Sequence, residues 1–319
     1  MKRTWQSRGV RWAAAAAALA LAAGALVLQQ RRQVARPSVS PERCRAVEAL
    51  ARQVQGEVVF QRLDREKRLS IWKETLGSTS ARRLTRDGRY PRWSHDGRVI
   101  AFLRGNQVML MNADGGSERL LARAGTPEPH AVAFAQNDRE VLFTDGNALQ
   151  AVALSNGVVR TVVSGRPYVG ADLSRDGTRL ITMVSGHEIL AYDLTRPSAK
   201  PRRIGRGCSA SFSPDAELIT NNLGGHLHMW VRRWGDGEIV GEYHAPAGLT
   251  FDNEAWSNHP RWLVSRTEQP GHQNIFVHDP FQDTAVQVTF VGDADRPDLH
   301  VDAGTSDRGD RRTVRTVGP

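Results

Sequence analysis

Residues 90–123 read YPRWSHDGRVIAFLRGNQVMLMNADGGSERLLAR. The aromatic residue Trp93 is followed by a serine and an Asp-Gly pair, and two apolar runs then lead to a second turn with Asp-Gly-Gly. Asp bonds its own backbone and Gly supplies a positive φ, so both turns favour hairpins. The apolar runs are rich in β-branched and large residues, as buried strands require. The stretch therefore predicts a unit of short antiparallel strands.

The same pattern recurs along the chain, as WSHDG, FAQND, LSRDG, FSPDA and WSNHP. Its first letters are Trp93, Phe134, Leu173, Phe212 and Trp256, which are 41, 39, 39 and 44 residues apart. A period near 40 with several strands per unit is typical of a β-propeller. A position that accepts Trp, Phe or Leu requires apolar volume, so we expect Trp93 to lie in the core between adjacent blades rather than to bind a ligand.

The two ends of the repeat region predict how the ring closes. Residues 56–86 hold three strands of a unit but lack the first, and Leu299 lies 43 residues beyond Trp256 in a segment with the first-strand pattern. A strand at 296–301 would complete the first blade and leave no unpaired edge. The sequence predicts an all-β, six-bladed propeller over 56–302, with blades at 56–86 plus 296–301, 90–123, 131–164, 168–206, 209–247 and 251–290.

The repeat resembles the WD40-like unit of TolB-type propellers. The matching residues are Pro91, Trp93, Ser94, Asp96, Gly97, Ile100, Ala101, Phe102, Asn112, Ala113, Asp114, Gly115 and Gly116, with a second copy at Phe212, Ser213, Pro214 and Asp215. The resemblance covers about residues 56–302 and is specific for the fold. Such propellers serve as interaction platforms, as periplasmic accessory proteins, or as domains of peptidases and lyases.

The amino terminus has the charge pattern of an exported or anchored chain. A basic segment (1–12) precedes an apolar run of 16 residues, Ala13–Leu28, and further basic residues follow. This run is longer than a usual signal-peptide core and slightly shorter than a usual membrane helix. We favour an uncleaved transmembrane anchor; a cleaved signal peptide and a buried Ala-rich helix remain alternatives. Residues 29–40 read as a linker, 41–55 as a short amphipathic helix, and 303–319 as a disordered tail.

The net charge of +9 does not indicate nucleic-acid binding, because residues 1–55 carry +8 of it. The remaining chain has a net charge of +1, and a phosphate-binding surface needs clustered positive charge. We therefore expect no nucleic-acid partner.

Polar residues near the first strand of several blades make a candidate ligand site. In the TolB-type architecture such positions lie near the central channel, where converging polar groups can bind a ligand. The alternative is ordinary loop residues satisfied by water. The candidates are Tyr90, His130, Tyr168, Asp252, Asn253, Glu254 and Arg296.

Two further groups of residues could carry chemistry. His226 and His228 would share one face of a strand and could bind a metal with a third ligand from His244, His259 or His272; we favour an exposed or hydrogen-bonded pair, and hence no metal or other cofactor. Cys44 and Cys208 are the only cysteines. An exported chain permits a disulfide between them, with two unpaired thiols as the alternative.

The sequence leaves two classes of function open. One is a non-catalytic, membrane-tethered periplasmic propeller that binds an envelope protein or glycan. The other is a carbohydrate-active lyase or hydrolase with its site in the channel. A lyase needs a base of tuned pKa and usually a metal or Arg clamp. Because the sequence shows scattered His residues, no dense acid–base set and no Gly-x-Ser-x-Gly motif, we favour binding.

Overall fold

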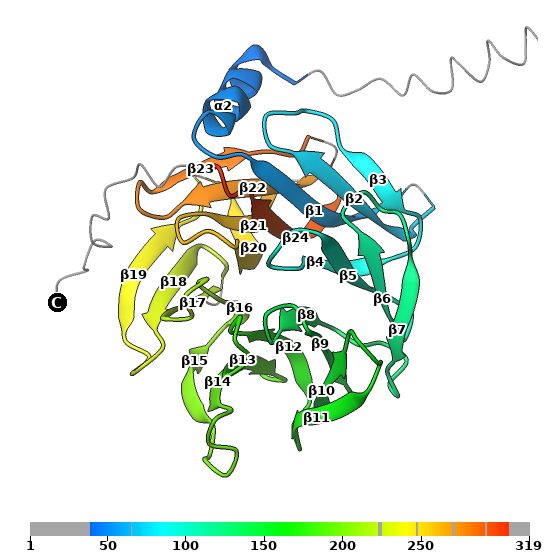
Figure 1. Cartoon of the computed structure of the whole chain (residues 1–319). Coiled ribbons are helices and arrows are strands. Elements are labelled where there is room, and N and C mark those ends of the chain that lie inside the picture. The colour runs from blue at the N-terminus through cyan, green and yellow to red at the C-terminus, as the bar shows by residue number, and fades with distance from the viewer. Residues whose placement is uncertain are drawn as a thin grey trace, which may run out of the picture. The chain divides into compact units, whose positions relative to one another are not determined.

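The computed structural model describes residues 39–64, 66–222, 225–246, 248–269, 272–290 and 292–305. Within these ranges the chain forms one helix and 24 strands. The strands make six four-stranded sheets, which stand around a common centre as the blades of a propeller (Figure 1). The predicted all-β, six-bladed fold is confirmed.

The blades are numbered in chain order, and the strands of each blade are given from the innermost to the outermost. Blade one consists of β24 (Ala294–Val301), β1 (Gly56–Leu63), β2 (Leu69–Thr75) and β3 (Arg82–Thr85). Blade two consists of β4 (Arg89–Trp93), β5 (Val99–Arg104), β6 (Gln107–Asn112) and β7 (Arg119–Arg123). Blade three consists of β8 (Val132–Ala135), β9 (Glu140–Asp145), β10 (Ala148–Ala153) and β11 (Val159–Ser164).

The remaining three blades follow the same order. Blade four consists of β12 (Tyr168–Leu173), β13 (Arg179–Val184), β14 (Glu188–Asp193) and β15 (Arg202–Arg206). Blade five consists of β16 (Cys208–Phe212), β17 (Leu218–Asn222), β18 (His228–Arg233) and β19 (Ile239–His244). Blade six consists of β20 (Thr250–Trp256), β21 (Leu263–Gln269), β22 (His272–Asp279) and β23 (Thr284–Gln287).

The ring closes through the carboxy-terminal strand. β24 pairs antiparallel with β1, and Leu299 lies opposite Val58 in the register. The Asn258 side chain of blade six bonds both the N–H and the carbonyl of Val301, at 2.7 and 3.0 Å. β24 therefore completes the first blade and links it to the sixth, which closes the ring.

The repeat residues form the inner part of the core. Trp93, Phe134, Leu173, Phe212, Trp256 and Leu299 are each at most 7% exposed. Trp93 packs in one cluster with Val59 and Ile71 of blade one and Ile100 and Phe102 of its own blade. Its place between two adjacent blades agrees with the apolar volume that the repeat predicts.

Side chains directly before the repeat residue tie neighbouring blades together. Asp298 accepts from the Trp93 N–H of the next blade at 2.7 Å, and Asp172 accepts from the Phe212 N–H at 2.9 Å. The Ser211 hydroxyl accepts from the Trp256 N–H at 3.0 Å. The blades are thus joined by buried hydrogen bonds as well as by apolar contact.

The helix α2 (Pro41–Ala51) lies beside the sixth blade. Ser40 caps it by accepting from the Arg43 N–H, and Pro41 occupies its first turn. Val47 and Leu50 are buried, and the helix contacts β23. Further along the chain, the Thr305 hydroxyl accepts from the Gln55 N–H at 3.2 Å, so the first residues of the predicted tail contact the residues that follow the helix.

The predicted anchor or signal segment, Ala13–Leu28, and the tail from residue 306 lie outside the described residues. Among the residues that are described, no helix is long and apolar enough to cross a membrane.

Candidate functional site

The inner strands share an unusual backbone position three residues before the repeat residue. Tyr90, Ser209, Asn253 and Arg296 hold this position in four blades, and their φ angles lie between 49° and 57°. Residues other than Gly rarely adopt this region, and the cost persists only where the surrounding structure holds it. The pairing with the second strand shifts register at each of these points. Such bulges change the direction in which side chains point, and here they direct these four side chains toward the channel.

A cavity at this end of the channel is lined by residues from all six inner strands. We call it the channel mouth; five of the seven predicted site residues line it, namely Tyr90, His130, Asn253, Glu254 and Arg296. The Arg296 guanidinium lies over the Tyr90 ring, 4.8 Å from its centre. This stacking holds an aromatic face and a positive charge together at the rim.

Tyr168 does not belong to the channel mouth, and its prediction as a site residue was wrong. It precedes the repeat residue Leu173 by five positions, whereas Tyr90 precedes Trp93 by three. Gly170 holds the equivalent position and lines the cavity. The Tyr168 ring is instead buried in the core between blades three and four, and its hydroxyl lies 3.2 Å from that of Tyr192.

Glu254 is the most deeply buried acid of the channel mouth, with only 2% of its surface exposed. One carboxyl oxygen accepts from the Asn222 side-chain amide at 3.1 Å. The other oxygen, Oε1, has no hydrogen-bond partner in the described chain. Burial raises the pKa of Glu254 well above its usual value.

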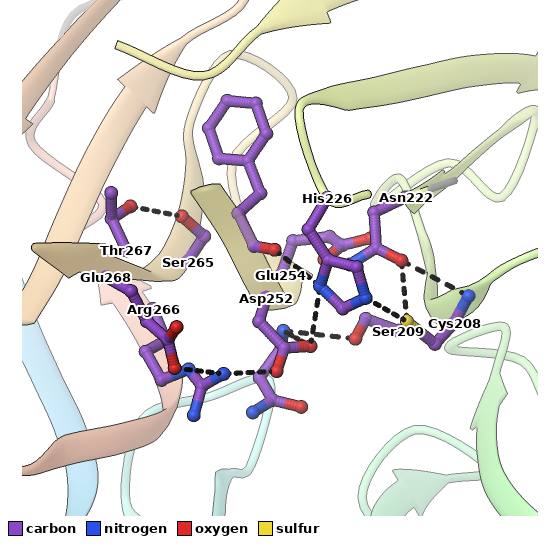
Figure 2. Close-up of polar contacts among 12 residues, drawn as sticks. Cys208, Ser209, Asn222, His226, Asp252, Glu254, Ser265, Arg266, Thr267 and Glu268 are labelled. Carbon is purple, nitrogen blue, oxygen red and sulfur yellow. Dashed lines mark hydrogen bonds and ion pairs between the residues drawn. The ribbon is translucent and has the colours of Figure 1, made fainter. Parts of the chain in front are cut away.

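Three side chains meet beside Glu254: Cys208 from β16, His226 from the β17–β18 loop and Asp252 from β20 (Figure 2). The Cys208 Sγ lies 3.9 Å from the His226 Nε2. The His226 Nδ1 lies 2.9 Å from the Phe251 carbonyl and 3.7 Å from an Asp252 oxygen. Asp252 thus lies at the edge of the channel mouth, next to the lining residues Asn253 and Glu254.

Arg266 is the main positive charge beside this group. Its guanidinium lies 2.5 Å from Asp252 and 3.1 Å from Glu268 (Figure 2). It also lies 3.6 Å from Asp295, which accepts from the Asn253 amide at 2.6 Å. One guanidinium therefore lies close to three carboxylates at this end of the channel.

The Cys208–His226 pair does not have the geometry of an activated nucleophile. A nucleophile and its base lie within about 3.2 Å of each other, and the observed separation is 3.9 Å. Burial and the nearby Glu254 and Asp252 carboxylates raise the pKa of Cys208 to about 12. Because the thiolate is the reactive form, this cysteine is not poised for covalent catalysis.

The predicted pairing of His226 and His228 on one strand face was wrong. β18 begins at His228, and His226 lies in the preceding loop with a φ of 56°. The two side chains enter different groups. His228 lies opposite His244, one of the three proposed third ligands, and its Nδ1 is 2.7 Å from Glu242. His226 instead joins Cys208 and Asp252.

The two other candidate metal ligands and the two cysteines are not brought together in the described part of the chain. Within the described part of the chain, neither His259 nor His272 joins a group of possible metal ligands. Cys44 and Cys208 are not joined. Cys44 lies on α2, which contacts the outermost strand β23, whereas Cys208 begins the innermost strand β16.

Alignment of the blades on the repeat residue also identifies Asp295 and Cys208, which were not among the predicted residues of the channel site. Four residues before the repeat residue stand His130, which lines the channel mouth, and Cys208, Asp252 and Asp295, each of which directly precedes a lining residue. Two residues before it, Glu254 occupies a position that is apolar in every other blade: Pro91, Val132, Ala171, Ala210 and Pro297. Both signals are visible once the repeats are aligned backwards from the turn.

Comparisons with known proteins support the fold. No protein-family model matches the sequence, and a search of curated proteins found no match. Among solved structures, TolB from Acinetobacter baumannii is similar, with a TM-score of 0.61 and 15% identity over 76% of this chain and 66% of TolB. This chain thus spans slightly less than two thirds of TolB. A chain of a nidogen/laminin complex is also similar, with a TM-score of 0.61 and 9% identity over 77% of this chain and 98% of that chain.

Proposed function

We propose that this chain is a non-catalytic binding platform that takes a protein or glycan of the cell envelope at its channel mouth. In this proposal the run Ala13–Leu28 anchors the chain in the inner membrane and the propeller lies in the periplasm. The observation that carries the proposal is the convergence of all six inner strands on one polar cavity, with four of them in a strained conformation. Backbone strain of this kind clusters at ligand sites.

The partners of the acidic groups favour binding over catalysis. Asp252 is engaged by Arg266, and Asp295 by Arg266 and Asn253. Burial raises the pKa of Glu254 well above its usual value, which disfavours its carboxylate form. A general base needs a carboxylate free to accept the substrate's proton. The rim instead offers Tyr90 and Arg296, residue types that are enriched at the centres of protein interfaces. The similar nidogen/laminin chain also comes from a complex of proteins.

Site-specific photo-crosslinking in intact cells tests this function. A benzophenone side chain placed at Tyr90 should give a covalent adduct with a partner. The same group at Leu120, on the outermost strand of the same blade and 44% exposed, should give none. Peptides of a second protein in the adduct would identify a protein, and glycosidase sensitivity a glycan.

A pair of arginine variants then locates the binding surface. Arg296→Ala should weaken the Tyr90 adduct at least about tenfold, since hot-spot truncations cost about 2 kcal/mol or more. Arg119→Ala, on the exposed outer strand β7, should leave it unchanged. Adducts formed at Leu120 but not at Tyr90 would contradict the proposal. Breakdown of an envelope polysaccharide by the purified chain, abolished by Glu254→Gln, would show an enzyme instead.

A further inference from the structure

The group Cys208, His226 and Asp252 has the composition and spacing of a metal site. Each residue offers one ligand atom, and the three atoms lie within 4.8 Å of one another. They come from a strand of blade five, a loop of blade five and a strand of blade six, so the fold rather than local sequence brings them together. A thiol, an imidazole and a carboxylate are the three ligand types that Zn²⁺ takes in proteins.

The surroundings orient these ligands as outer-shell groups do in metal sites. The His226 Nδ1 donates to the Phe251 carbonyl, which leaves Nε2 with a free lone pair on the side of Cys208 (Figure 2). One Asp252 oxygen is held by Arg266. Such second contacts fix the tautomer and the rotamer of metal ligands.

Glu254 supplies an independent indication that something is bound here. It is 2% exposed, lines the channel mouth, and its Oε1 has no partner in the described chain. Its other oxygen is linked through the Asn222 amide to Cys208, because the Asn222 oxygen accepts from the cysteine N–H and Sγ. A buried carboxyl oxygen without a partner is costly unless a bound group satisfies it.

We propose that Cys208, His226 and Asp252 bind a divalent transition metal of the Zn²⁺ class, with Glu254 beside the ion at the channel mouth. On binding, the Cys208 thiol gives up its proton to solvent and Sγ binds as the thiolate. The sulfur and nitrogen donors disfavour Ca²⁺ and Mg²⁺, which prefer oxygen ligands. Three protein ligands leave a fourth position for water or for an oxygen atom of a ligand. This site goes beyond the proposed binding function and does not depend on it.

The group His228, Glu242 and His244 provides an internal comparison. Its ligand atoms also lie within 4.8 Å of one another, but it contains no thiol, and His244 is exposed. A metal bound there would lack a sulfur ligand, so spectroscopy can tell the two groups apart.

Titration of the untagged, metal-free full chain with Co²⁺ tests the site. We expect one ion to bind per chain, with a thiolate-to-cobalt charge-transfer band and the intense visible bands of a four-coordinate ion, and Zn²⁺ should displace it. Cys208→Ser should abolish the charge-transfer band. His226→Gln and Asp252→Asn should each lower the affinity at least about tenfold, as loss of an outer-shell contact alone costs 10–100-fold.

Two matched controls separate the site from other sources of binding. Cys44→Ser removes the only other thiol, and His228→Gln removes a ligand of the comparison group; neither should change the cobalt spectrum. Absence of a thiolate band in the wild-type chain would overturn the proposal, whether or not any variant folds. Bands that survive Cys208→Ser, or that disappear only with Cys44→Ser or His228→Gln, would overturn it as well.

Discussion

The two tryptophans of the repeat should respond differently to the same substitution. Trp93 and Trp256 hold equivalent positions and are 7% and 6% exposed. The Trp256 Nε1 donates to the Pro260 carbonyl at 3.2 Å, whereas the Trp93 Nε1 is buried and has no hydrogen-bond partner among the described residues. Trp→Phe therefore removes a satisfied donor at one site and an unsatisfied one at the other.

The expected magnitudes follow from these contacts. Loss of the larger ring leaves a void of roughly 40 Å³ at either site, which costs about 1 kcal/mol at about 24 cal/mol per Å³. At Trp256 the lost hydrogen bond adds about 1 kcal/mol, for a total near 2 kcal/mol. At Trp93 the substitution removes an unsatisfied N–H, which stabilises the fold by about 1 kcal/mol, so the net change in the free energy of unfolding is near zero. Trp93→Ala, which empties the site, should cost about 3–5 kcal/mol.

Urea denaturation of the purified full chain, followed by circular dichroism, measures these differences. The three variants should share the wild-type slope, so that midpoints report stability alone. Trp256→Phe should unfold at a clearly lower urea concentration than Trp93→Phe. If both substitutions cost the same, the Trp93 Nε1 has a partner in solution, and the reasoning from its unsatisfied donor is refuted. If Trp93→Ala left stability unchanged, the repeat residue would not be a core residue.

Three further predictions concern pH, ring closure and the amino terminus. Burial raises the pKa of Glu74 from 4.5 to about 8, so the stability that its protonated form contributes is present below pH 4.5 and is lost as the pH rises through 8. Glu74→Gln cannot ionise, so its free energy of unfolding should exceed that of the wild type by up to about 5 kcal/mol at pH 9 and equal it near pH 4. Urea denaturation measures both values, and a difference that does not change with pH would contradict this. Deleting 294–319 should lower the melting temperature strongly because β24 is lost, whereas deleting 306–319 should leave it nearly unchanged; equal melting temperatures would refute closure by β24. The full chain should fractionate with the inner membrane and begin near Met1 on amino-terminal sequencing, and a soluble chain that begins near Leu26 would identify a cleaved signal peptide.

The fold was predictable because the repeat carries it in local patterns. Turn residues, strand residues and the aromatic position recur at a fixed period, and each is selected by short-range physics. The closing strand at Leu299 could be inferred for the same reason, since its spacing continues the series. This strand pairs with β1, which is far away in the sequence. The pairing could still be predicted because residues 56–86 hold only three strands of a four-stranded blade.

The site was only partly predictable because its residues are joined across blades. Asn253, Glu254 and Arg296 were found from their place next to a repeat residue, which sets their distance from the channel. Tyr168 was misplaced because a shift of two residues along a strand moves a side chain from the mouth into the core. The contact of Cys208 with His226 depends on the path of the β17–β18 loop, for which the sequence has no periodic signal.

Glu254 argues most strongly that the channel mouth serves a function rather than the fold. The fold itself accepts proline, valine or alanine at this position, as the other five blades show. A carboxyl group here is buried to 98%, and one of its oxygens has no partner among the described residues, so it costs stability that an apolar residue would not. A residue that breaks a local rule without a structural gain marks a functional site. The neighbours of Glu254, Cys208 and Asp252, belong to the innermost strands of blades five and six. The chemistry of this propeller is therefore concentrated where blades five and six meet at the channel mouth.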